Sequence, residues 1–168
     1  MGVINTKMPD GSPGFSLLII ITAEFPPIQL GFGFTLNGVG GLLGLNRTAR
    51  IDVLRQGIKT NVLNSILFPT DVVANMSRII SDLKQVFPPL NDRFLIMPMG
   101  KLGWGAPTVL TLELGLLLEI PVARIAILGV IKALLPGEDK ALLRLQVNFL
   151  GVIDFENKYI SFDASLYD

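Results

Sequence analysis

One stretch, residues 108–120, restricts the fold of this chain more than any other part of the sequence. Every second position from 110 to 120 holds leucine or isoleucine, while threonine, glutamate and glycine occupy most of the positions between them. Because successive side chains of a strand point to opposite faces of a sheet, this period of two predicts a long β-strand with one apolar face. A helix would instead require apolar residues at spacings of three and four.

Weaker alternation recurs along most of the chain and predicts about seven strands in all. Most of them exceed the usual length of about five or six residues, and the connections between them are short. Short connections favour antiparallel pairing, and long strands favour a strongly curled sheet. The expected strands are residues 15–25, 28–36, 93–102, 108–120, 123–135, 141–152 and 160–166.

The middle of the chain has a helical pattern instead. Apolar residues from Val72 to Phe87 recur at spacings of three and four, Thr70 can cap the start of this helix, and Pro88 ends it. One or two shorter helices are expected before it. We therefore expect two or three helices within residues 46–87.

Together these patterns predict an α+β fold, in which a long, curled antiparallel sheet in ββ-αα-βββββ order carries the helices on one face. The length of 168 residues suits a single domain, 1–168. The last strand runs to the end of the sequence and would leave an open edge, so we interpret the chain as a fragment of a longer protein or as one that pairs with a neighbour. The expected parts are a lead-in loop at 1–14, a β-hairpin at 15–37, a helical insert at 46–87 and a β-meander at 93–168.

Composition narrows the classes of function. The chain has no cysteine and no histidine, which excludes Cys-His and Ser-His-Asp nucleophilic enzymes and the usual zinc sites. Basic and acidic residues balance at 14 each, so a nucleic-acid partner is not expected. No apolar run reaches the ~18 residues of a membrane helix, and the N-terminus has no secretory signal pattern, which leaves the compartment open with the cytoplasm as the default.

The acidic residues do not form a recognisable catalytic constellation. Glu113 and Glu119 share one face of a strand but lie about 20 Å apart along it, too far for a carboxylate pair. We expect them on a solvated face with Arg124, Lys132 and Arg144 as cross-strand partners. No catalytic, cofactor-binding or metal-binding residue is predicted, and an enzyme is not expected. A pocket that holds Lys132 or Arg144 beside a buried carboxylate would reopen that possibility.

A glycine-rich stretch offers one candidate binding surface. Gly31 and Gly33 alternate with Phe32 and Phe34, and glycines on one strand face would leave a shallow trough in which a ring or helix could lie. The lone tryptophan, Trp104, stands between two glycines and is expected to plug the end of the sheet or to form a ligand platform. These five residues are the predicted trough for an apolar ligand.

Four segments are distinctive in their order and spacing: GFGFTLNGVGGLLGLNR, SILFPTDVVAN, VFPPLNDRFLIMPMGKLGWG and GVIDFENKYISFDASLYD. Through them the chain, from Phe15 to Asp168, resembles a domain-of-unknown-function family found in very long, β-rich microbial proteins. The resemblance implies that the chain is an internal segment of a much longer protein. It implies no activity, no cofactor and no site residue.

The apolar excess separates the remaining hypotheses. Half of the residues are apolar, only 17% are charged, and the mean hydropathy is +0.56. Apolar surface beyond what the helices can cover would face more protein or a lipid. We therefore expect a non-catalytic structural module that self-associates or pairs through its sheet edges, and as the alternative a module that binds lipid in a trough of the curved sheet.

Overall fold

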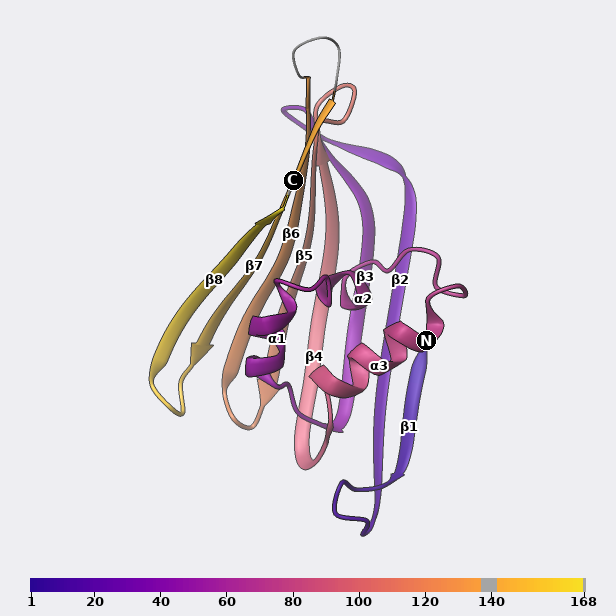
Figure 1. The fold of residues 1–168 in the computed structure, drawn as a ribbon, viewed down its shortest axis with the longest axis vertical. Helices are drawn as coiled ribbons and strands as arrows, with labels where there is room; N and C mark the ends of the chain where they lie inside the picture. The colour runs from indigo at the N-terminus through magenta and orange to yellow at the C-terminus, as the bar shows by residue number, and fades with distance from the viewer. Residues whose placement is uncertain (137–141, 168) are drawn as a thin grey trace.

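The computed structural model describes residues 1–136 and 142–167, and it forms one antiparallel sheet whose strand order follows the chain (Figure 1). Each strand pairs with the strand before it and the strand after it, so no connection crosses the sheet. The eight strands are β1 (Gly2–Lys7), β2 (Pro13–Gly31), β3 (Phe34–Arg47), β4 (Pro89–Trp104), β5 (Leu110–Ile120), β6 (Arg124–Pro136), β7 (Leu142–Asp154) and β8 (Tyr159–Tyr167).

The three helices fall between β3 and β4 and lie in front of the sheet in Figure 1. They are α1 (Ile51–Gly57), α2 (Leu63–Ile66) and α3 (Met76–Val86). The expected helix over the Val72 stripe is therefore shorter at its start, because residues 71–75 form a turn and Asp71 has a positive φ of 48°. No helix within residues 1–136 and 142–167 has the length and apolar character needed to cross a lipid bilayer.

The expected count of seven strands was wrong by one. Residues 2–7, expected within a lead-in loop, form β1 and pair with β2 from Gly2 opposite Ile19 to Lys7 opposite Pro13. This strand has only six residues, so its own sequence carries little periodicity. It is held by the neighbouring strand and by Val3, which is buried against the core.

The first hairpin also differs from the expected one. Pro26 and Pro27 were expected to separate two strands, but β2 continues through them, and the register shifts between Glu24 and Ile28. A proline pair removes two backbone donors, which a bulge at this position accommodates. The chain reverses later, where Gly31 and Gly33 both adopt positive φ.

The core lies between the helices and one face of the sheet, which we call the inner face. Leu54, Leu63, Ile79 and Leu83 of the helices are fully buried there, and side chains of β2 to β7 meet them. The sheet contributes Leu18, Ile20, Leu42, Leu95, Met97, Leu117, Leu128, Leu150 and Val152 to this core.

Candidate functional site: the outer face of the sheet

The opposite side of the sheet, which we call the outer face, has an unbroken apolar surface across seven strands. Its members follow from strand alternation and from the register of each strand pair. The outer face consists of Leu17, Ile19 and Ile21; Phe34, Leu36, Gly41, Leu43 and Leu45; Phe94, Ile96, Pro98, Leu102 and Trp104; Leu110, Leu112, Leu114, Leu116, Leu118 and Ile120; Ile125, Ile127, Gly129 and Ile131; Val147, Phe149, Gly151 and Ile153; and Ile160, Phe162, Ala164 and Leu166.

The charged residues of β5 to β8 all lie on the inner face, which the helices partly cover. The expectation of a solvated face for Glu113 and Glu119 was therefore wrong, because both are buried. The expected partners Arg124 and Lys132 do approach them, Arg124 at 2.6 Å from Glu119 and Lys132 at 3.9 Å from Glu113. The face without charge is left open, whereas the helices cover part of the face that bears charge.

The exposed area of the outer face is large for a single chain. A dozen of its large apolar side chains are 36–79% exposed. The four most exposed are Ile21 of β2 and Ile160, Phe162 and Leu166 of β8. At roughly 180 Å² for each fully exposed side chain, they present on the order of 1,000 Å² of apolar surface. The largest apolar patch on a typical monomer is about 300–600 Å². A half-solvated antiparallel sheet normally turns its polar side to water, which is the reverse of what this sheet does.

One rung of the sheet combines a hollow at one end with a projecting ring at the other. We call it the Gly41 row; its members stand opposite one another from β2 to β8. At Gly41 an apolar hollow of about 470 Å³ opens between Ile21 and Pro98, and an added Cβ there would meet only the Met97 carbonyl oxygen, at 3.8 Å. The row consists of Ile21, Gly41, Pro98, Leu116, Ile127, Gly151 and Phe162.

Aromatic rings lie beside two other glycines of the outer face, Gly129 and Gly151, and a Cβ added at Gly151 would meet the Phe162 ring at 3.7 Å. A Cβ added at Gly129 would come within 2.0 Å of the Phe149 ring, so that ring lies across the glycine. The Phe149 and Phe162 rings stack with their centroids 6.1 Å apart. These contacts make a continuous aromatic surface over β6, β7 and β8 and leave Phe162 70% exposed.

The predicted trough residues lie at the hairpin end of the outer face. Gly31, Phe32 and Gly33 form the tip that joins β2 to β3, and Phe32 is almost fully exposed. The Trp104 indole Nε1 donates a hydrogen bond to the Phe32 carbonyl oxygen at 3.1 Å, and its ring packs 6.5 Å from the Phe34 ring. Gly33 permits this approach, because a Cβ there would lie 3.1 Å from the indole nitrogen.

Phe34 and Trp104 share a second, smaller hollow of about 220 Å³ on the outer face, whereas Gly31 and Phe32 do not line it. Leu102, Leu110, Leu112 and Ile131 complete its apolar walls. Strand alternation predicts the sheet face of each of these side chains, taken one at a time. The hollow could not be read from the sequence, because it depends on the register between β3, β4, β5 and β6.

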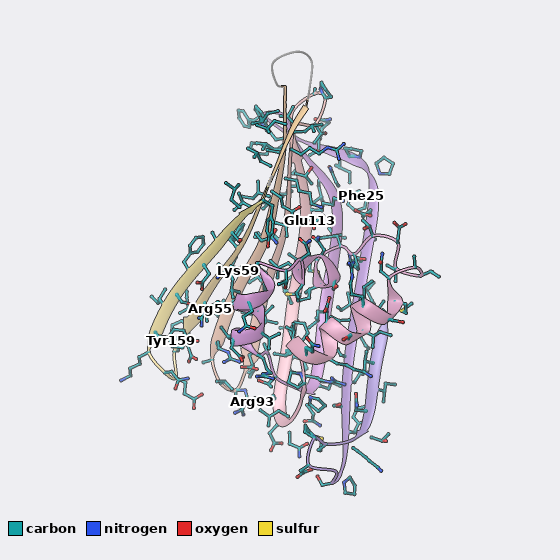
Figure 2. The ribbon with its side chains drawn as sticks, in the orientation of Figure 1. Phe25, Arg55, Lys59, Arg93, Glu113 and Tyr159 are labelled. Carbon is teal, nitrogen blue, oxygen red and sulfur yellow. The ribbon has the colours of Figure 1, made fainter. Side chains whose placement is uncertain are left out.

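Charged groups gather on the inner face beyond the helices, where Figure 2 labels Glu113. The Glu113 carboxylate lies 3.9 Å from both Lys101 and Lys132, and burial raises its pKa above the ordinary value, against the opposing effect of the two lysines. A cavity of about 490 Å³ nearby is lined by Lys132, Arg144, Thr111 and Gln146, among others. Glu113 is not part of its wall, but the buried Glu113 carboxylate lies 3.9 Å from the wall residue Lys132. The arrangement named above as reopening the enzyme hypothesis, a cavity that holds Lys132 beside a buried carboxylate, is therefore present.

Glu119 has a structural role in the same layer. It accepts hydrogen bonds from the Thr48 hydroxyl and, at 2.9 Å, from the Ala49 N–H, and so ties the start of the helical segment to β5. Among the described residues, no group of three or more acidic side chains is arranged to hold a metal ion. Glu119 thus serves to hold the start of the helical segment against the sheet.

Comparison with known proteins identifies a family but no activity. A family model whose description is "family of unknown function (DUF6603)" matches residues 1–168. This confirms the resemblance to a family of unknown function, while the occurrence of that family in very long proteins stays a prediction. No curated protein and no solved structure matches the chain.

Proposed function

This chain belongs to the DUF6603 family, and because that family has no established function, we propose from the geometry that the chain is a non-catalytic structural module whose outer face packs against a second apolar protein layer. The observation that carries the proposal is the absence of charge from the outer face residues, while all charged residues of β5 to β8 lie on the inner face. Burying apolar area stabilises by about 25 cal/mol per Å², so an open face of this size strongly favours a covering layer.

The outer face of the sheet offers a partner more contact area than the sheet edges do. β1 and β8 each have one side without a pairing strand among the described residues, so edge pairing remains a second route to assembly. An added strand would cover only the backbone groups of one edge. A layer on the outer face would cover apolar side chains from β2 to β8 at once.

Light scattering on dilute protein tests this proposal. We expect the unmodified chain to form a defined oligomer. Ile127→Lys places a charge near the centre of the outer face and is expected to give a folded monomer, because a charge buried between apolar layers is strongly unfavourable. The control is Val73→Lys in the loop before α3, where the side chain is 89% exposed, and it should leave the oligomer unchanged. A monomeric, lipid-free and soluble unmodified protein would contradict the proposal.

The second candidate is a module that binds apolar ligands such as lipids on the same face. The hollows at Gly41 and at Phe34 favour it, since both have apolar walls and open on the outer face. Mass spectrometry of organic extracts from mildly purified protein tests it. Acyl lipid in a fixed ratio to the chain would support this candidate over the structural module.

A further inference from the structure

We propose that the layer covering the outer face is a second copy of this chain, related by a two-fold axis that runs along the strands between β5 and β6. This inference rests on the structural role proposed above and specifies the partner and the contact. In such a dimer the Phe162 ring of each copy enters the Gly41 hollow of the other.

The positions along the Gly41 row support the two-fold arrangement. Gly41 on β3 and Phe162 on β8 stand on the same rung, on opposite sides of the boundary between β5 and β6. Rotation by half a turn about an axis along that boundary exchanges the two sides of the row. The ring therefore meets the hollow twice, once in each direction, which is the reciprocity that a two-fold interface requires.

The size and chemistry of the contact also fit. An apolar cavity of ~150 Å³ accepts a benzene ring, so the hollow of about 470 Å³ has room for the phenyl ring of Phe162 and the side chains beside it. A second contact follows from the same rotation. Leu166 of β8 lies on the rung of Leu36, Leu102 and Leu112, and the rotation would place it over Leu36 of the partner, beside the smaller hollow that Leu102 and Leu112 line.

A second copy suits this face better than an unlike partner. Unlike partners are selected largely by complementary charge, and the outer face residues include no charged side chain. Two identical sheets share the same twist, so their faces stay opposed along the whole row after the rotation. The apolar area, on the order of 1,000 Å² per copy, meets the ~800 Å² per partner of a standard stable interface.

Cysteine cross-linking tests the contact, and the natural chain, which contains no cysteine, provides a clean background. Phe162→Cys and Gly41→Cys proteins are purified separately, mixed to exchange subunits, and treated with a short bis-maleimide. We expect a cross-linked dimer in the mixture and little in either protein alone, because equivalent positions lie on opposite sides of the axis. The control mixture pairs Gly41→Cys with Phe32→Cys, whose position is 98% exposed at the hairpin tip, and should not cross-link.

Exchange of the ring and the hollow gives a second test. Gly41→Phe fills the hollow with a ring, for which the monomer has space. This variant is expected to weaken dimerisation at least tenfold. Combining it with Phe162→Gly moves the ring to the other side of the interface and should restore most of the affinity, with folding checked by circular dichroism.

The outcomes separate this inference from the proposed function. An oligomer by light scattering that does not cross-link between positions 41 and 162 overturns the two-fold contact and leaves the structural role standing. Equal cross-linking of Phe162→Cys with itself also overturns it. A monomer without lipid overturns both, and a monomer with bound lipid replaces both with the second candidate.

Discussion

Glu113 is the carboxylate whose ionisation the fold opposes most clearly. Its side chain is buried on the inner face, and burial raises its pKa, although Lys132 and Lys101 favour the charged form and Glu24 disfavours it. A raised pKa means that the folded chain binds this proton more tightly than the unfolded chain does. The resulting stabilisation is complete below the ordinary value of 4.5 and is lost as the pH rises through the raised pKa.

The variant Glu113→Gln tests this sign. It removes the titrating group and keeps a side chain of nearly the same shape between the two lysines. We expect its free energy of unfolding, relative to the unmodified chain, to increase from pH 4 to pH 7. Urea denaturation at the two pH values measures the difference. A relative stability that falls between pH 4 and pH 7 would show that the lysines, and not burial, dominate.

Arg47 is a buried cation held by neutral oxygens. Its guanidinium donates to the Phe87 carbonyl oxygen at 2.9 Å and to the Asn5 side-chain oxygen, and so joins the end of β3 to the end of α3 and to β1. Burial lowers the pKa of Arg47. The position therefore depends on packing and hydrogen bonds and not on a salt bridge.

Arg47→Ala is expected to destabilise the chain by about 3 kcal/mol, because it leaves a cavity and unpaired acceptors in the core. The matched control is Arg50→Ala, three residues away, whose ion pair with Asp52 is more than half exposed. A surface pair of this kind contributes less than about 1 kcal/mol. Thermal or urea unfolding of both variants measures the contrast, and equal losses would contradict the role assigned to Arg47.

Among the elements, β6 and β7 depend on a pairing of glycine with an aromatic ring. The Phe149 ring occupies the space above Gly129, where a side chain would otherwise stand. Such coverage protects the backbone of a strand that glycine alone would leave exposed. The opposite case occurs on β4, where no atom lies within 4 Å of a Cβ added at Gly100.

These two glycines make a matched pair. Gly129→Ala must displace the Phe149 ring, and we expect a loss of about 1–3 kcal/mol in the free energy of unfolding. Gly100→Ala has open space and should change it by less than about 1 kcal/mol, and in the stabilising direction. Urea midpoints measure both. In a Phe149→Ala background the cost of Gly129→Ala should shrink, and an unchanged cost would show that the ring is not its cause.

The strands show how far the sequence predicts this fold. The alternation of residues 110–120 predicted β5 correctly, and similar patterns located β6, β7 and β8, because period two is a local property of the chain. The sequence did not show that the helices would cover the side with Glu113 and Glu119. That choice depends on where the helical segment docks, and its start is held by Thr48 and Ala49 against Glu119. A short strand such as β1, held mainly by its neighbour, escapes local patterns for the same reason.

The predicted trough shows the same limit at smaller scale. Phe34 and Trp104, both large apolar residues next to glycine, line an apolar hollow, and the binding of an apolar ligand there stays a prediction. The larger hollow at Gly41 was missed. Its depth comes from Ile21 and Pro98 on the adjacent strands, and such a rung is defined only after the register is known.

For the whole molecule, the proposed dimer would make folding and assembly depend on each other. The helices cover part of the charged inner face, and the outer face has no equivalent cover within residues 1–136 and 142–167. A folded dimer that buries this face is stabilised by mass action, since the unfolded chain cannot form it.

The midpoint of thermal unfolding should therefore rise with protein concentration. We expect a clear increase over a hundredfold range for the unmodified chain, and a lower, concentration-independent midpoint for Ile127→Lys. Calorimetry or circular dichroism at several concentrations measures both. A midpoint of the unmodified chain that does not change with concentration would contradict the linkage between folding and assembly.

The strand order of the sheet has an evolutionary consequence. Since each strand is bonded only to its predecessor and successor in the chain, duplication of a hairpin at β1 or β8 would widen the sheet without moving any existing strand. The strands of each duplicated hairpin would keep the alternation of their side chains between the two faces, and would therefore extend the uncharged outer face. Proteins of very different size can therefore arise from this plan by simple repetition.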